Sequence, residues 1–252
     1  MLKEIQKAVD LFKESFSKQD TICYILTGAG ISKASNIPTF RGEDGLWEKY
    51  NFEEVATFQA WKKNPQKLWG LYQEGVGVIF DAKPNEAHYA ISKLEENKMC
   101  QYVITQNIDS LHQRAGSKKI IELHGNISRI KCSKCRKSYI LDGPPKEVPP
   151  LCSCGSILRP DVVFFGESLP EKEIREAFQI AEKADIVLVV GTSAEVVPAA
   201  SLPYISKRKG AKVFVFNPEK TDHANIADVF IQGKCEELLP IFVEELIKQF
   251  EK

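Results

Sequence analysis

The chain of 252 residues is 43% apolar and 27% charged, and its 34 Lys and Arg balance its 34 Asp and Glu. This near-average composition excludes a disordered chain and a fibrous repeat, and a formal net charge of zero argues against a surface built throughout to bind nucleic acid or anionic membrane. Apolar runs such as Ile186–Val190 are far shorter than the roughly 20 residues that span a bilayer, and residues 1–16 lack the pattern of a secretion signal. We therefore expect a cytoplasmic protein with no membrane partner.

The predicted elements alternate between amphipathic helices and buried strands. Apolar residues at spacings of three and four predict a first helix over residues 2–16. Continuous β-prone runs predict strands at 21–27, 102–105, 186–190 and 213–216, and helical patterns occupy 87–94, 174–181 and 239–250. This alternation predicts an α/β fold with an open parallel sheet, covered by helices on both faces, that binds its ligand at the carboxyl ends of the strands.

Two stretches interrupt the alternation. Residues 39–84 are rich in aromatic residues and glycine, and residues 126–158 hold a cysteine cluster and two Pro-Pro pairs. We predict that both are insertions forming a smaller lobe, while residues 1–38, 85–125 and 159–252 form the domain built on the sheet.

A glycine turn follows the first predicted strand. Gly28-Ala29-Gly30 would let backbone N–H groups approach a pyrophosphate, and the N-terminus of a following helix would favour its negative charge. Lys33 stands where the dinucleotide fingerprint of dehydrogenases has a small residue, which disfavours that class and leaves open a turn without special function. Arg41 lies just beyond the turn and could pair with phosphate, although a loop arginine is ordinarily solvated.

Further polar side chains are expected at the same edge of the sheet. Gln106, Asn107 and Asp109 come directly after the strand at 102–105, so they should stand at its carboxyl end. His124 follows the apolar pair Ile120-Ile121 and should lie near this edge. A single histidine is more often a hydrogen-bonded structural residue than a catalyst, and only the neighbouring polar groups favour a catalytic role for His124.

The seven cysteines are unevenly distributed. The spacing Cys132-x2-Cys135-x16-Cys152-x-Cys154 is typical of a closed structural Zn²⁺ site, in which sulfur fills every position and leaves none for catalysis. Residues 126–160 also contain seven Lys and Arg against Asp142 and Glu147. This basic surface would be a solvated face or, as an alternative function, the nucleic-acid surface of a zinc-ribbon adaptor.

Motifs spread over residues 20–240 resemble those of the sirtuins, a family of NAD-dependent protein-lysine deacylases. In chain order they are Gly28-Ala29-Gly30-Ile31-Ser32, Ile37-Pro38-Thr39-Phe40-Arg41, Thr105-Gln106-Asn107-Ile108-Asp109, Leu123-His124-Gly125-Asn126, the four clustered cysteines, Phe164-Phe165-Gly166-Glu167, Gly191-Thr192-Ser193 and Asn217-Pro218-Glu219. The resemblance implies a Rossmann-like domain with a smaller lobe, in which residues 39–84 form a cofactor loop and a helical insertion and residues 126–158 form a zinc ribbon. It also implies NAD⁺ as co-substrate and one structural Zn²⁺.

The resemblance also implies roles for single residues. Catalysis would fall to His124 and Asn107. The residues expected to bind NAD⁺ are Gly28, Ala29, Gly30, Ile37, Phe40, Arg41, Gln106, Asn107, Ile108, Asp109, Gly191, Thr192, Ser193, Asn217, Pro218, Glu219 and Cys235. An extended acyl-lysine peptide would lie between two segments, Val163-Phe164-Phe165-Gly166 and Glu195-Val196-Val197, and pair with both.

The implied reaction transfers an acyl group from lysine to ADP-ribose. The acyl oxygen displaces nicotinamide from the ribose, and His124 then acts as general base on a ribose hydroxyl, giving free lysine and O-acyl-ADP-ribose. Family members that prefer succinyl or malonyl lysine carry Tyr-x-x-Arg, whereas here Gly75 stands three places after Tyr72. We therefore expect a neutral acyl group. Mono-ADP-ribosyl transfer from the same bound NAD⁺ is the alternative enzyme activity.

Overall fold

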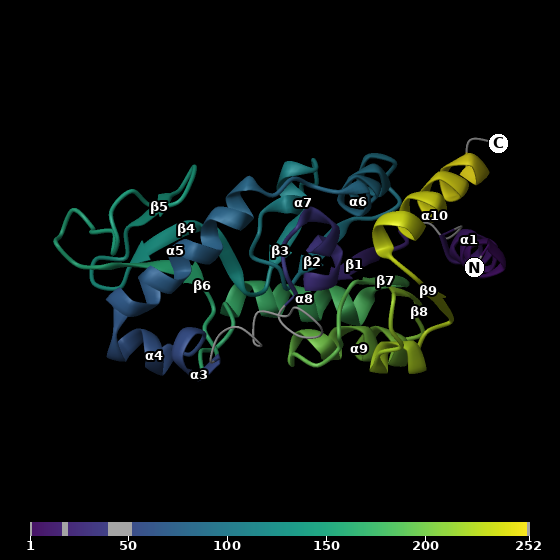
Figure 1. Cartoon of the computed structure of the whole chain (residues 1–252). Helices are drawn as coiled ribbons and strands as arrows, with labels where there is room; N and C mark the ends of the chain where they lie inside the picture. The colour runs from purple at the N-terminus through teal and green to yellow at the C-terminus, as the bar shows by residue number, and fades with distance from the viewer. Residues whose placement is uncertain (1, 17–19, 40–51, 251–252) are drawn as a thin grey trace.

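The structure is a computed structural model that describes residues 2–16, 20–39 and 52–250. A six-stranded sheet with its helices forms one end of the molecule, and a three-stranded sheet with three helices forms the other (Figure 1). Among the described helices, none is long and apolar enough to cross a bilayer.

The larger sheet has the strand order β3-β2-β1-β7-β8-β9, and every neighbouring pair is parallel. Its strands are β1 (Cys23–Thr27), β2 (Tyr102–Thr105), β3 (Ile120–Glu122), β7 (Ile186–Val190), β8 (Lys212–Asn217) and β9 (Val229–Gln232). The four predicted strands occupy its centre, and the short β3 and β9 form its edges. This is the order of the doubly wound dinucleotide-binding fold.

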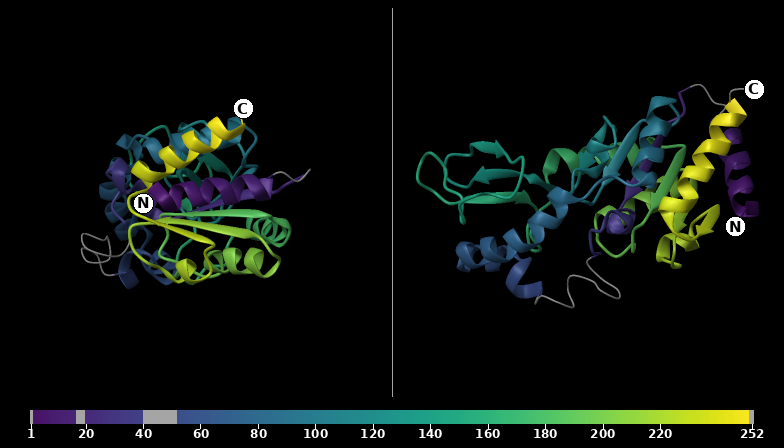
Figure 2. Two further views of the ribbon diagram at one scale, coloured as in Figure 1. Left: turned by 90° about the vertical axis from the view of Figure 1, so that its right-hand side faces the viewer. Right: turned by 45° about the horizontal axis from the view of Figure 1, so that its top comes forward.

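Helices cover both faces of this sheet (Figure 2). The helices α1 (Leu2–Phe16), α6 (Glu86–Glu96) and α10 (Cys235–Phe250) pack on one face, and α8 (Glu171–Lys183) and α9 (Leu202–Arg208) pack on the other. Successive strand residues point to opposite faces, so Ile25 joins the first core and Leu26 the second. Both faces of the sheet are covered by helices and excluded from water, which explains why its central strands are continuous apolar runs. The predicted fold class is confirmed.

The smaller sheet, of order β5-β4-β6, is antiparallel. It comprises β4 (Gly125–Cys132), β5 (Ser138–Ile140) and β6 (Leu158–Val162), and beside it lie α3 (Phe52–Val55), α4 (Phe58–Lys63) and α5 (Pro65–Asp81). Trp61 and Trp69 from the helices join Ile130, Leu158 and Phe164 in one apolar cluster. The two insertions therefore pack together, although the cluster reaches beyond residue 158. The domain limits given above stay a prediction.

Short helical turns complete the described chain: η1 (Ala29–Ser35), α7 (Leu111–Arg114), η2 (Ala199–Ser201) and η3 (Asp222–Asn225). The helix expected after the glycine turn is thus a 3₁₀ helix of seven residues.

Candidate active site at the carboxyl edge of the sheet

Two glycine turns meet where the order of the strands reverses, between β1 and β7. The N–H of Gly30 donates to the carbonyl of Gly191 at 2.8 Å, and the N–H of Gly28 donates to Val190 at 3.3 Å. A Cβ on Gly30 would lie 2.7 Å from the Gly191 oxygen, and Gly191 itself has a φ of +60°. Contact between the two turns therefore requires glycine here, whatever ligand the turns hold.

Three buried polar side chains form a chain of hydrogen bonds beside this junction. The hydroxyl of Ser32, on η1, donates to Oδ2 of Asp109 at 2.7 Å and accepts from Nδ2 of Asn107 at 3.1 Å. Burial raises the pKa of Asp109, while the N–H of Leu111 and the Ser32 hydroxyl act against that rise by donating to the carboxylate. The amide and the carboxyl group are thus held in fixed orientations.

His124 lies at the end of the neighbouring strand β3. Its Nδ1 is 2.9 Å from the carbonyl oxygen of Gln106, so Nδ1 carries the proton and Nε2 holds a lone pair. The Gln106 side chain donates to Thr192 Oγ1 at 3.1 Å, which ties this histidine to the turn after β7. Burial lowers the pKa of His124 and keeps the ring neutral near pH 7. A neutral imidazole with a free Nε2 can accept a proton.

The segment Val163–Phe165 continues from β6 past the histidine. Val163 donates its N–H to the carbonyl of His124 at 2.9 Å, Phe164 donates to Glu167 Oε2, and Phe165 donates to the carbonyl of Ala56 at 2.8 Å. These three amide donors are bonded within the chain, and the carbonyls of Phe164 and Phe165 already accept the N–H groups of Glu167 and Phe58, each at 3.0 Å. A peptide could therefore pair with Phe164 and Phe165 only through the second lone pairs of these carbonyls. Fewer backbone groups of this segment are therefore open to the predicted peptide pairing than its length suggests.

A buried ion pair fixes the loop that follows this segment. The guanidinium of Arg159 donates to both oxygens of Glu167 at 2.7 Å, and its Cζ lies 4.9 Å from the centroid of the Phe164 ring. Because each partner neutralises the other, both charges can leave water. The ion pair therefore holds the loop against the smaller lobe.

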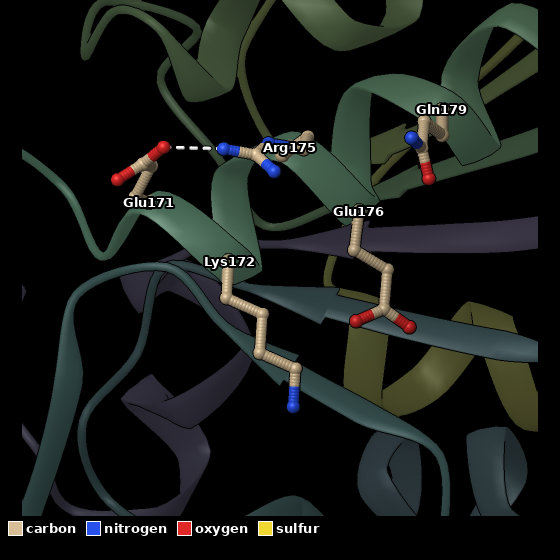
Figure 3. Close-up of a pocket in the computed structure, with 5 residues that line it drawn as sticks. All are labelled: Glu171, Lys172, Arg175, Glu176 and Gln179. Atoms are coloured by element: carbon tan, nitrogen blue, oxygen red, sulfur yellow. Dashed lines mark hydrogen bonds and ion pairs between the residues drawn. The ribbon is translucent and has the colours of Figure 1, made fainter.

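Two shallow hollows lie on the described surface near α8. One is lined by Glu167, Ser168, Leu169, Glu171, Ile174, Val197 and Pro198, and so it separates the two segments expected to hold a peptide. The other is lined by Glu171, Lys172, Arg175, Glu176 and Gln179, which all come from α8, and Glu171 pairs with Arg175 across it (Figure 3). None of the predicted site residues lines this second hollow.

The remaining predicted cofactor contacts surround the ends of β8 and β9. Asn217 donates to the carbonyl of Glu219 at 2.8 Å, and Gln232 donates to the carbonyl of Pro218 at 3.1 Å. The thiol of Cys235, at the start of α10, lies 3.9 Å from the carbonyl of Gly30. Burial raises the pKa of this thiol to about 12, so it is neutral at pH 7.

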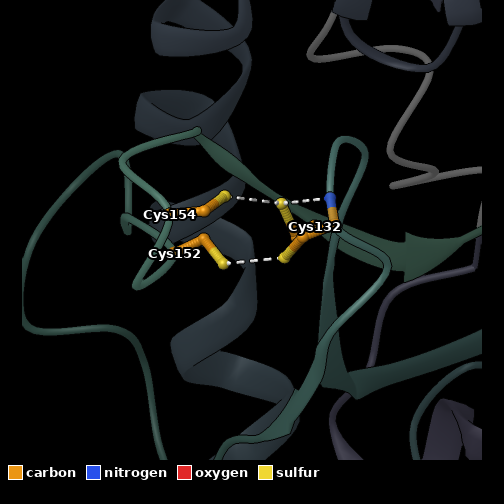
Figure 4. A group of neighbouring side chains, drawn as sticks. Cys132, Cys152 and Cys154 are labelled. Carbon is orange, nitrogen blue, oxygen red and sulfur yellow. Dashed lines mark hydrogen bonds between the residues drawn. The ribbon is translucent and has the colours of Figure 1, made fainter.

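The four clustered cysteines come together in the smaller lobe. Cys132 ends β4, and Cys152 and Cys154 face it from a separate loop (Figure 4). The sulfur atoms of Cys132 and Cys154 are 3.6 Å apart, those of Cys135 and Cys152 are 3.4 Å apart, and all four lie within 4.8 Å. Tetrahedral zinc with bonds of about 2.3 Å needs sulfurs about 3.8 Å apart. The donor set and its spacing fit a closed structural zinc site.

The sequence matches the Sir2 family model over residues 28–198. The chain belongs to the Sir2 family. It is 52% identical to the NAD-dependent protein deacylase 2 of Pyrobaculum aerophilum, over 89% of this chain and 90% of that relative. It is 50% identical to the NAD-dependent protein deacylase of Pyrococcus furiosus, over 90% of this chain and 94% of that relative.

Solved Sir2 structures share the fold. A Sir2 homologue in complex with ADP-ribose superposes with a TM-score of 0.92 at 43% identity, covering 96% of this chain and 97% of the other. A Sir2 variant with a deacetylated p53 peptide and 3′-O-acetyl ADP-ribose gives a TM-score of 0.87 at 39% identity, covering 96% and 98%. The family assignment from sequence motifs is confirmed.

Within this Sir2 chain, most of the predicted site residues gather at one edge of the sheet, but not all. Phe40 and Arg41 fall outside the described residues. Ile37 is buried against Ala82 and Leu111, and Ile108 packs on the cluster of the smaller lobe. Glycine turns at the strand reversal, with amide and carboxyl side chains beside them, fit a dinucleotide such as NAD⁺.

Sequence reasoning gave no role to three residues that order this Sir2 site. Ser32 and Thr105 stand in the sequence analysis only as parts of motifs, and Thr27 only as the last residue of a strand. The hydroxyl of Thr27 donates to that of Thr105 at 2.8 Å, and Thr105 is followed directly in the chain by Gln106 and Asn107. The available signal was a β-branched polar residue ending each of two adjacent apolar strands.

Proposed function

We propose that the chain is an NAD-dependent protein-lysine deacylase, with His124 as its general base. The observation that carries this proposal is the bond from His124 Nδ1 to the Gln106 carbonyl, which leaves Nε2 unprotonated at the carboxyl edge of the sheet. Deacylases are also the relatives that it matches over nearly its whole length.

Each side chain of the site then has a task. Asn107 and Asp109, held by Ser32, would orient the nicotinamide end of NAD⁺, and Gln106 would contact its ribose. His124 would take the proton of a ribose hydroxyl once the acyl oxygen of lysine has displaced nicotinamide. Asn217 and the backbone at Cys235 would contact the adenosine end.

The acyl pocket should favour neutral groups. The Tyr72 hydroxyl is buried with no hydrogen-bond partner, and its ring packs edge-on against Trp69 at 5.3 Å. Tyr72 therefore belongs to the apolar cluster of the smaller lobe. We propose acetyl or another uncharged acyl group as the substrate, because Gly75 stands where family members that prefer succinyl or malonyl lysine carry the arginine that would pair with a carboxylate.

The test follows nicotinamide release and peptide mass together during incubation with NAD⁺ and acetyl-lysine peptides. The wild-type chain should release nicotinamide only with an acylated peptide and should return unmodified lysine. His124→Ala should lose this turnover while still binding NAD⁺, and Lys183→Ala, at an exposed position in the last turn of α8, serves as a control outside the proposed chemistry. ADP-ribose left on the peptide would instead favour the transferase activity, and nicotinamide release independent of peptide would refute the deacylase proposal.

Three of the seven basic residues in the stretch 126–160 pair with acidic groups of the chain, which weakens the nucleic-acid alternative. Arg129 pairs with Glu122 and Asp161, Lys131 pairs with Asp161, and the guanidinium of Arg159 is buried against Glu167. These cations already have acidic partners within the chain. The cytoplasmic location stays a prediction.

A further inference from the structure

A polar seam runs between α6 and α7, on the side of the glycine turn away from β7. His88, Ser92 and Glu95 share one face of α6, and His112, Gly116 and Ser117 lie against them. The two histidine rings are 5.0 Å apart between centroids. Seven buried side-chain atoms of the described residues lack a hydrogen-bond partner, and four of them belong to this seam: His88 Nε2, Glu95 Oε1, His112 Nδ1 and Ser117 Oγ. Buried polar groups that are not fully paired call for a functional explanation.

Hydrogen bonds fix the tautomer of both rings. His88 Nδ1 accepts the N–H of Asn85 at 3.3 Å, so the neutral ring carries its proton on Nε2. The hydroxyl of Thr27 donates to Thr105, so Thr27 Oγ1 must accept from His112 Nε2, 2.9 Å away. His112 then carries its proton on Nε2 and a lone pair on Nδ1. The two unpartnered ring atoms, one N–H and one lone pair, are complementary. Burial also lowers the pKa of both rings, which keeps them neutral.

From His112 the bonds continue into the site. Thr105 Oγ1 receives the Thr27 hydroxyl and also the N–H of Asn107, at 3.0 Å. The carbonyl of Thr27 accepts the N–H of Gln106, and the carbonyl of Thr105 accepts the N–H of Leu123, each at 3.0 Å. The two threonines thus hold the backbone on both sides of the bond between Gln106 and His124.

We propose that His112 is a positioning residue for this site, because its Nε2–H sets the direction of the Thr27 and Thr105 hydroxyls and so fixes Asn107 and the carbonyl that orients His124. His88 supports it by packing its neutral ring beside that of His112, with 5.0 Å between the two centroids. The kinetic part of this inference rests on the proposed function; the tautomers and the backbone positions do not. Neither ring touches the reacting atoms.

Two substitutions separate the hydrogen bond from simple packing. In His112→Gln the amide nitrogen stands as many bonds from Cα as Nε2 does and keeps a donor for Thr27. His112→Leu fills the space but removes the donor. We expect His112→Leu to lower kcat for nicotinamide release about tenfold, the effect of losing one buried hydrogen bond, with the peptide KM within twofold of wild type. His112→Gln should recover most of kcat. Thr27→Val, which is nearly isosteric, should repeat the loss if His112→Leu does not fold.

A spectroscopic measurement tests the positioning without turnover. Long-range ¹⁵N–¹H correlation of the histidine rings should show His112 protonated on Nε2 at pH 7, and the amide resonance of Asn107 should move in His112→Leu and return in His112→Gln. A His112 proton on Nδ1, an unmoved Asn107 amide, or equal kcat in the Leu and Gln variants would overturn the proposal. If the wild-type chain released no nicotinamide, the proposed function would fail, and the ring and amide signals would still decide the positioning.

Discussion

Acid should destabilise the protein through His88 by an amount that the structure allows to be worked out. Burial lowers the pKa of His88 from an ordinary 6.5 to about 4. Between pH 6.5 and pH 4, His88 is therefore mostly protonated in the unfolded chain and mostly neutral in the folded chain. The free energy of unfolding falls as the pH falls through this range. The difference of roughly 2.5 pKa units corresponds to about 3 kcal/mol in total, of which about 2 kcal/mol is lost between pH 7 and pH 5.

The assay is urea unfolding of the zinc-loaded protein at pH 7 and pH 5, for the wild type and His88→Asn. The Asn Oδ1 stands as many bonds from Cα as His Nδ1 and can still accept the N–H of Asn85, but it does not titrate. Wild type should lose about 2 kcal/mol more than His88→Asn between the two pH values. The contributions of the zinc ligands, of His124 and of His223, which both proteins share, cancel in this difference. Burial and His88 both lower the pKa of His112, so the difference includes the part of the His112 shift that His88 causes. Equal losses in the two proteins would show that His88 is protonated in the fold at pH 5 and would refute the burial argument.

Three further predictions concern the turns, the metal and the substrate. Gly30→Ala should lower the free energy of unfolding, measured in urea, by about 2 kcal/mol or more, because the added Cβ would lie 2.7 Å from the Gly191 oxygen. Gly77→Ala on α5 is the control: its added Cβ has open space around it, so it should raise the free energy of unfolding by up to about 1 kcal/mol. Metal analysis should find one zinc per chain, and its chelation or Cys152→Ser should lower the Tm by about 10 °C through the smaller lobe; an unchanged Tm would count against a structural metal. Acetyl-lysine peptides should turn over faster than succinyl-lysine peptides, and the reverse order would show a cation in the acyl pocket that the described residues do not supply.

The sequence was informative wherever one local pattern determined the outcome. The strands at Cys23–Thr27 and Ile186–Val190 are dry on both faces, so continuous apolar runs identify them. The edge strands β3 and β9 have three and four residues and pair with a neighbour on one side only, so neither is a fully buried apolar run of the kind that identifies the central strands. The first insertion is helical, as the sequence analysis expects, but no local pattern gave the bounds of its helices, because their apolar side chains pack on the zinc-ribbon sheet, a partner that comes later in the sequence.

The sequence predicted where the site lies, but not which of its side chains are hydrogen-bonded to one another. Residues that follow parallel strands must meet at one edge, and this placed Asn107, Asp109 and His124 near the glycine turns. No local pattern could show that Ser32 joins Asn107 to Asp109, or that Thr27 and Thr105 share a hydrogen bond, because these bonds span 75 or more residues. The roles of His88 and His112 depend on their contact across two helices, which spacing alone does not reveal.

The turn after β1 explains why the departure from the dehydrogenase fingerprint at Lys33 is structurally harmless. In that fingerprint a small residue at this position lets a long helix pack closely on the first strand. Here the chain forms the 3₁₀ helix Ala29–Ser35, which ends at Asn36 with a left-handed φ of 62°. Lys33 is exposed on this short helix, whereas Ser32, one residue earlier, is buried and hydrogen-bonded to Asn107 and Asp109. The short 3₁₀ helix thus has two effects. It leaves room for Lys33 where the fingerprint has a small residue, and it points the Ser32 hydroxyl toward Asn107 and Asp109, which orders the candidate pocket.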